Sequence, residues 1–196
     1  MRKLVFVTSN AGKAHEARER LEPLGFEVEQ RDLDILEVQA DDLDVVATEK
    51  ARAAATNLRG PFFLEDAGLF VAGLRGFPGV YSAPTFRTIG CEGLLRLMRG
   101  MRAGRNAEFR AVIAYHEPKT ALRLFRGACA GTIATRARGD QGFGFDPIFV
   151  PDGGDGRTFG EMEAEAKNLV SHRGRALDAF AAFLATKGAQ RERGKR

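Results

Sequence analysis

The chain has 196 residues, of which 44% are hydrophobic and 29% charged, and its formal net charge is +4. This length suits one domain of two lobes, and the composition excludes a largely disordered chain. No apolar run approaches the roughly 20 residues that span a bilayer, and Cys91 and Cys129 lack metal-ligand spacing, so we expect neither a membrane segment nor structural zinc, and a cytoplasmic location.

Strands and helices alternate in the first half of the predicted fold. The predicted elements are a strand over 4–7, a helix over 13–24, a strand over 26–30, a helix from about 42 to 58, and a strand over 62–64. Gly25 stops the first helix, and Asp41 or Asp42 caps the second. The third strand is expected to deliver Glu65 and Asp66 at its carboxyl end.

In the second half, a strand pair is expected between two Gly-rich loops. The predicted elements are a hydrophobic loop over 68–84, a helix over 93–101, paired strands over 109–115 and 122–130, a Gly- and aromatic-rich loop over 139–151, a short helix capped by Thr158, and a last helix capped by Ser171. The last helix should turn its apolar side chains, Leu177, Phe180, Phe183 and Leu184, inward.

These elements predict an α/β fold with a mixed β-sheet, flanking helices and two lobes, the Gly-rich loops forming the rim of a cleft. We expect a single domain over 1–186 and a basic, disordered tail over 187–196. Five basic residues and one acidic residue in this tail account for the net charge, because 25 basic and 25 acidic residues balance elsewhere. The charge therefore gives no support for nucleic-acid binding.

A polar turn joins the first strand to the first helix. Its polar side chains are Thr8, Ser9, Asn10 and Lys13. Free amide groups and the positive helix end suit an anion at this point. The turn is not a Walker A loop, because Val7 takes the first glycine position and Ala14 the magnesium-binding one. The alternative is a simple turn with an Asn N-cap.

Acidic residues form a second candidate group. Glu65 and Asp66 follow an apolar strand, and Glu37 lies in an apolar segment. Carboxylates at such a corner can hold Mg²⁺ and polarise a water molecule, as phosphoryl chemistry requires. For each acid alone, the alternative is an ordinary solvated position.

A third group combines aromatic and cationic side chains. Phe143 and Phe145, between glycines, suit stacking on a planar base, although they could equally plug the space between two lobes. Lys167 and the segment 171–173, Ser-His-Arg, offer donors to a phosphate or a base carbonyl, the alternative being a surface pair.

Together these segments resemble the Ham1-like nucleoside triphosphate pyrophosphatases, also called inosine or xanthosine triphosphate pyrophosphatases. The matching motifs follow the family order over essentially the whole chain up to the tail. They are residues 8–13, 36–39, 50–51, 65–69, 76–82, 142–149, 167 and 171–177.

The resemblance implies an enzyme, a hydrolase that cleaves the α–β phosphoanhydride of ITP, dITP and XTP and so cleanses the nucleotide pool of non-standard purines. It implies Mg²⁺ as cofactor, an elongated fold around a central nucleotide-binding cleft, and a homodimer. No specific nucleic acid is expected as a partner.

Site roles follow from the same resemblance. Asp66 falls on the catalytic acid, and Glu37, Asp66 and Glu65 form the implied metal set. The implied substrate-binding residues are Thr8, Ser9, Asn10, Lys13, Lys50, Ala67, Phe145, Asp146, Lys167, His172 and Arg173. Ala67 stands where many members have Ser, and Phe145 where Tyr or Trp is usual, so the ranking of substrates stays open.

The sequence is also compatible with two other functions. A Maf-like nucleotide pyrophosphatase would have a different substrate range. A nucleotide- or RNA-binding module would use the basic tail and the aromatic loop, with salt-sensitive binding and no pyrophosphate release.

Overall fold

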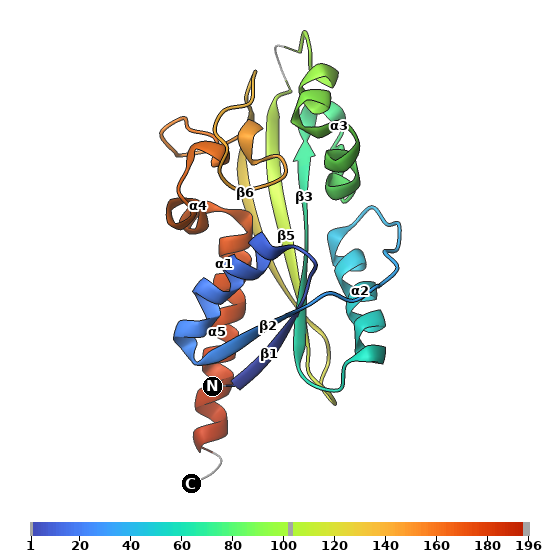
Figure 1. Cartoon of the computed structure of the whole chain (residues 1–196), viewed down its shortest axis with the longest axis vertical. Helices are drawn as coiled ribbons and strands as arrows, with labels where there is room; N and C mark the ends of the chain where they lie inside the picture. The colour runs from blue at the N-terminus through green and yellow to red at the C-terminus, as the bar shows by residue number, and fades with distance from the viewer. Residues whose placement is uncertain (1, 102–103, 194–196) are drawn as a thin grey trace.

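A seven-stranded mixed sheet forms the centre of the computed structural model, which describes residues 2–101 and 104–193 (Figure 1). The strands are β1 (Arg2–Val7), β2 (Phe26–Arg31), β3 (Phe62–Val71), β4 (Pro78–Gly79), β5 (Asn106–His116), β6 (Arg123–Ile133) and β7 (Phe149–Pro151). The α-helices are α1 (Ala11–Leu21), α2 (Leu43–Asn57), α3 (Ser82–Leu97), α4 (Ala164–Val170) and α5 (His172–Arg193). No described helix has the length and apolar character that membrane spanning requires.

The sheet has the order β2-β1-β3-β5-β6-β7, with β4 paired to the outer part of β3. β1 is parallel to β2 and β3, whereas β3, β5, β6 and β7 are mutually antiparallel neighbours. β1 pairs with only Phe62–Leu64 of β3, and the rest of β3 continues beyond it along β5. This offset leaves the middle of β3 without a strand on one side, and the predicted mixed α/β fold is confirmed.

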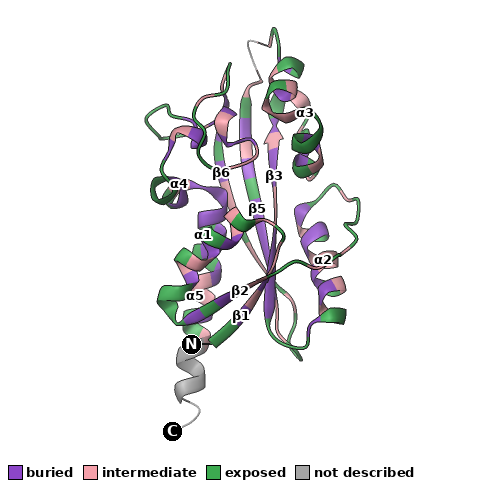
Figure 2. Ribbon diagram, in the orientation of Figure 1, coloured by how far each residue is buried: buried purple, intermediate pink, exposed green. Residues whose placement is uncertain are grey.

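Alternation along β3 distributes its apolar side chains between two cores. Phe63 packs with α1 and α5 on one face of the sheet, whereas Phe62 and Leu64 pack with α2 on the other. A third core lies at the far end of the long strands, where α3 meets the segment 145–162. Figure 2 shows these buried stretches running along the central strands. The first two cores cover opposite faces of the sheet around β1, and the third lies at the other end of β3 and β5, so the three cores divide between the two predicted lobes.

Two predicted elements need correction, and one helix was missed. The strand over 62–64 continues to Val71, because it pairs with β5 throughout, so Glu65 and Asp66 lie within a strand and not at its end. The helix predicted over 93–101 is α3, which begins at Ser82 and ends at Leu97; Pro84 lies in its first turn, where proline is tolerated. α4 was not predicted.

The carboxyl end also differs from the prediction. α5 extends to Arg193, so residues 187–193 are helical where a disordered tail was expected. Lys187 is ion-paired with Glu117 at the end of β5. Ala, Gln, Arg and Glu favour a helix, but this segment has no apolar periodicity. The helix was therefore predicted to end too early. Residues 194–196 of the predicted tail lie outside the described residues.

Candidate active site

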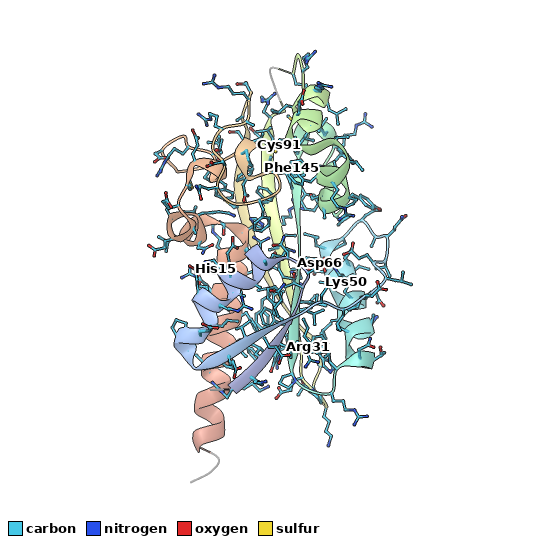
Figure 3. The ribbon with its side chains drawn as sticks, viewed as in Figure 1. His15, Arg31, Lys50, Asp66, Cys91 and Phe145 are labelled. Atoms are coloured by element: carbon cyan, nitrogen blue, oxygen red, sulfur yellow. The ribbon has the colours of Figure 1, made fainter. Side chains whose placement is uncertain are left out.

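A cleft of about 480 Å³ opens beside the middle of β3. It is bounded by the turn after β1, the segment before α2, α2 itself and the start of α3. Figure 3 shows Asp66 and Lys50 near the centre of the molecule. Predicted site residues on the cleft wall are Thr8, Ser9, Asn10, Lys13, Glu37, Lys50, Glu65, Asp66 and Ala67.

The turn after β1 is built as an N-cap. Asn10 Oδ1 accepts a hydrogen bond from the Lys13 amide at 3.1 Å, and Thr8 Oγ1 accepts one from the Asn10 amide at 3.1 Å. The first-turn amides of Ala11 and Gly12 remain available for an anion, as at other helix N-termini. The predicted Asn10 N-cap is thus confirmed, and the helix N-terminus that it begins is where the predicted anion site would lie.

Lys50 joins two carboxylates on the α2 side of the sheet. Its Nζ lies 2.8 Å from Asp66 Oδ1 and 2.7 Å from Glu37 Oε1. Asp66 Oδ2 is buried and has no hydrogen-bond partner among the described residues. Burial raises the pKa of Asp66, and the opposing charge of Lys50 does not cancel this effect. A half-buried carboxylate with one unpartnered oxygen is suited to accept a proton from water.

The same two carboxylates fit a divalent cation in part. Glu37 and Asp66 already converge on one ammonium group, and Asp66 keeps an oxygen without a partner. Mg²⁺ is often held by one or two carboxylates together with substrate phosphates. Within the described residues, no group of three His, Cys, Asp or Glu side chains could hold a metal ion.

Glu65 belongs to the opposite face of β3. Its Oε2 lies 2.6 Å from Lys13 Nζ, and its Oε1 accepts a hydrogen bond from Arg173 Nε at 3.1 Å. Burial acts to raise the pKa of Glu65, but the charges of Arg173 and Lys13 outweigh it and the pKa is lowered. Because neighbours in a strand point to opposite faces, the structure does not bring Glu65 together with Asp66 and Glu37 as expected.

The predicted base-recognition residues gather in a second, buried group. Lys167 Nζ and the Phe143 amide both donate to Asp146 Oδ2 at 2.8 Å. His172 stacks on Phe109 at 4.6 Å between ring centroids, and its Nδ1 has no hydrogen-bond partner among the described residues. Burial, reinforced by Arg173, holds the pKa of His172 well below its usual value. These surroundings therefore favour the neutral imidazole.

Phe145 and Phe143 have different surroundings. Phe145 is buried in the core beneath α3, edge-on to Phe86. The Phe143 ring lies over Lys167 Nζ and over the Arg173 guanidinium, each about 4.9 Å from its centroid. It also contacts Gly12, where an added Cβ would be 3.0 Å from the ring. Phe143 thus lies between the phosphate turn and the base group.

Sequence reasoning did not include three residues in the site: Phe143, Glu16 and Arg87. Phe143 was considered for stacking, yet only Phe145 matched the implied base position. Glu16 follows Lys13 by three residues, a helical spacing that places both on one face of α1. Arg87 borders the cleft from α3, and its charge contributes to lowering the pKa of Glu37. No sequence signal distinguished Arg87, because it lies between the predicted loop over 68–84 and the predicted helix over 93–101, where no element was assigned.

Fold and site together define an α/β protein whose central cleft joins a helix N-terminus, two lysines and a half-buried aspartate. This arrangement is suited to a phosphate-bearing ligand. The Ham1 family matches residues 4–183, and the chain belongs to this family.

Known relatives cover nearly the whole chain. The chain is 54% identical over 182 residues to a dITP/XTP pyrophosphatase of Thermococcus kodakarensis, spanning 93% of this chain and 97% of that protein. It is 48% identical to a dITP/XTP pyrophosphatase of Methanopyrus kandleri, spanning 91% and 94%. A HAM1 protein from Coxiella burnetii has the same fold, with a TM-score of 0.84 at 31% identity, covering 95% of this chain and 100% of that one. These matches do not favour the Maf-like alternative.

Proposed function

We propose that this protein hydrolyses non-standard purine nucleoside triphosphates, such as dITP, ITP and XTP, to the monophosphate and pyrophosphate. The relatives named as dITP/XTP pyrophosphatases support this reaction. The observation that carries the proposal is the position of Asp66, a half-buried carboxylate with an unpartnered oxygen, in the same cleft as a helix N-terminus, Lys13 and Lys50. The protein is thus a hydrolase of nucleoside triphosphates.

Asp66 is the proposed base. With its oxygen Oδ2 unpartnered, it orients a water molecule and takes its proton as the oxygen attacks the α-phosphorus. The bond from the α-phosphorus to the bridging oxygen breaks, and pyrophosphate leaves. Asn10, Lys13 and Lys50 stabilise the charge on the departing group, with Thr8 and Ser9 shaping the turn around it.

Glu37 and Asp66 are the proposed ligands of Mg²⁺. When bound, the ion would neutralise phosphate charge and polarise the α-phosphate. Lys50 lies between these carboxylates and is available to move toward the phosphates. Glu65 is omitted from the proposed ligands, because Lys13 and Arg173 engage both of its oxygens.

Selection of the base is assigned to the buried second group, while Ala67 lines the cleft near the phosphate-binding residues. Donors from Lys167, His172 or Arg173 would meet the 6-keto oxygen of hypoxanthine or xanthine. Adenine presents an amino group there, which would leave buried donors unpaired. Asp146 completes the proposed group by holding Lys167 at 2.8 Å. Phe145, implied for base stacking by the resemblance, instead packs in the core beneath α3.

A homodimer in the cytoplasm completes the proposal and rests on the resemblance to the family. Light scattering after size-exclusion chromatography would test the dimer. A mass equal to one chain at working concentration would remove this part of the proposal without affecting the reaction.

A pyrophosphate-release panel tests the function. It compares ITP, dITP, XTP, GTP, ATP and dTTP, each with and without Mg²⁺. We expect release from the first three only, and only with Mg²⁺. Equal release from ITP, XTP, GTP and ATP would contradict the proposed selectivity.

The substitution Asp66→Asn tests the assigned base. Loss of a positioned base should lower kcat by roughly 10²- to 10⁴-fold, while ITP still binds in isothermal calorimetry. Asp32→Asn is the matched control, because Asp32 is an exposed acid on the same cleft wall. Near-normal turnover of Asp66→Asn would refute the assignment.

A further inference from the structure

An alternating chain of buried charges links the two ends of the site. Lys13 pairs with Glu65 at 2.6 Å, and Glu65 with Arg173 at 3.1 Å. Arg173 then pairs with Glu16 at 3.0 Å, Glu16 with Lys167 at 3.3 Å, and Lys167 with Asp146 at 2.8 Å. Three cations and three carboxylates balance one another. The chain runs from the phosphate turn to the base group.

Glu16 occupies the centre of this chain. Its side chain is 9% exposed, and its two oxygens contact different cations, Oε1 contacting Lys167 and Oε2 contacting Arg173. Breaking a buried pair on one side leaves an uncompensated charge. The orientation of both cations therefore depends on one carboxylate that the proposed reaction does not use.

α1 also links Glu16 rigidly to the phosphate turn. Lys13, at the phosphate turn, precedes Glu16 by one helical turn on the same rigid element. Glu16 contacts Lys167 on α4 and Arg173 on α5 from this helix. The helix thereby fixes the spacing between the anion site and the donors of the base group.

We infer that Glu16 is a positioning residue for base selection, which holds Lys167 and Arg173 at a set distance from the phosphate turn. This inference rests on the proposed function. Without the carboxylate, Lys167 keeps only Asp146 and Arg173 keeps only Glu65 among their present ionic partners. Donors that can reorient lose their preference for a keto oxygen over an amino group.

The variant Glu16→Gln tests this role, since it removes the charge and keeps the shape. The ratio of kcat/KM for ITP to that for ATP should fall at least tenfold, mainly through ITP. Inhibition by inorganic pyrophosphate should not change, because Lys13 and Glu65 remain. A general structural defect would weaken both. Glu19→Gln is the control: Glu19 lies on the same helix and accepts a hydrogen bond from Asn168 at 2.9 Å, but contacts neither Lys167 nor Arg173.

Glu16→Asp covers the case in which Glu16→Gln does not fold, because it keeps the charge and shortens the side chain. It should give an intermediate loss of the ITP-to-ATP ratio. An unchanged ratio in every folded Glu16 variant would overturn the inference while the proposed function stands. Failure of the wild-type protein to release pyrophosphate from any triphosphate would instead refute the proposed function.

Discussion

Two carboxylates that are neighbours in the chain, Glu65 and Asp66, experience opposite electrostatic environments. Arg173 and Lys13 flank Glu65 and lower its pKa despite burial, whereas burial raises the pKa of Asp66 against the charges of Lys50 and Lys13. Strand alternation causes this difference, because each residue points to its own face of the sheet. Pairs of acids whose pKa values are driven apart mark which one can exchange protons during a reaction.

The pH dependence of turnover should report the pKa of Asp66. A base must be deprotonated, so activity falls as the pH drops through that value. Lys50 lowers this pKa by its charge. Lys50→Met should therefore shift the acid limb of the kcat/KM profile to higher pH, with the plateau reduced on the order of 10²-fold through lost phosphate stabilisation.

The matched control for this profile is Lys3→Met. Lys3 on β1 lies away from the cleft, and its Nζ is 3.6 Å from Glu29 Oε2 on β2. The acid limb of this variant should coincide with that of the wild-type protein. An acid limb that stays in place in Lys50→Met, or moves to lower pH, would contradict the assignment of Asp66 as the base.

The sequence predicts those site residues that lie in recognisable motifs, and misses those whose role arises from tertiary packing. Asn10, Lys13 and Asp66 lie in motifs that resemble a family, and the structure brings them to one cleft. Glu65 was grouped with Asp66 because adjacency in the chain does not reveal that β3 continues past it. Glu16 has no motif of its own: its importance arises only when α4 and α5 pack against α1.

Elements with strong local signals were predicted well. β1, β2, α1 and the β5–β6 pair match the expected positions within a few residues, and Ser171 caps α5 through the Gly174 amide at 3.0 Å. The misplaced elements lack such signals. α3 starts in a segment rich in Gly and Pro, and the last turns of α5 contain no apolar repeat. Pairing with β5 sets the end of β3, whereas helix propensity without an apolar repeat extends α5.

The close packing of α5 on β6 at Gly127 should contribute to the stability of the protein. A Cβ at Gly127 would lie 2.0 Å from the His172 carbonyl oxygen and 2.5 Å from the Ala176 nitrogen. Gly127→Ala should therefore displace the first turn of α5 and lower the free energy of unfolding by roughly 1–3 kcal/mol. Urea denaturation followed by circular dichroism measures this loss.

Gly60→Ala is the control for this substitution, since no atom lies within 4 Å of the added Cβ there. Its free energy of unfolding should stay within about 0.5 kcal/mol of the wild-type value. Equal stability of Gly127→Ala and the wild-type protein would show that the helix shifts without cost and would contradict the close packing.

Across the whole molecule, the long strands β3 and β5 run from the core of one lobe to the core of the other (Figure 1). The cleft lies beside the middle of β3. Basic residues approach this cleft from both sides: Lys13 and Lys50 from the lobe of α1 and α2, Arg87 from α3. The net charge of the chain says little about the substrate. The arrangement of local charges, with cations around a carboxylate-lined centre, favours a single nucleotide over a polymer.

Arg87 should contribute to triphosphate binding from across the cleft. Its side chain is exposed, and it makes no ion pair or hydrogen bond with the described residues, so its charge is free for an anion. Arg87→Ala should raise KM for ITP roughly tenfold, the size of one charge-assisted hydrogen bond, and leave kcat nearly unchanged. High salt should reduce this difference, because exposed charges are screened.

The control is Arg96→Ala in α3. Arg96 pairs with Glu92, so this variant should leave KM unchanged. An unchanged KM at low salt in Arg87→Ala would show that α3 borders the cleft without binding the triphosphate.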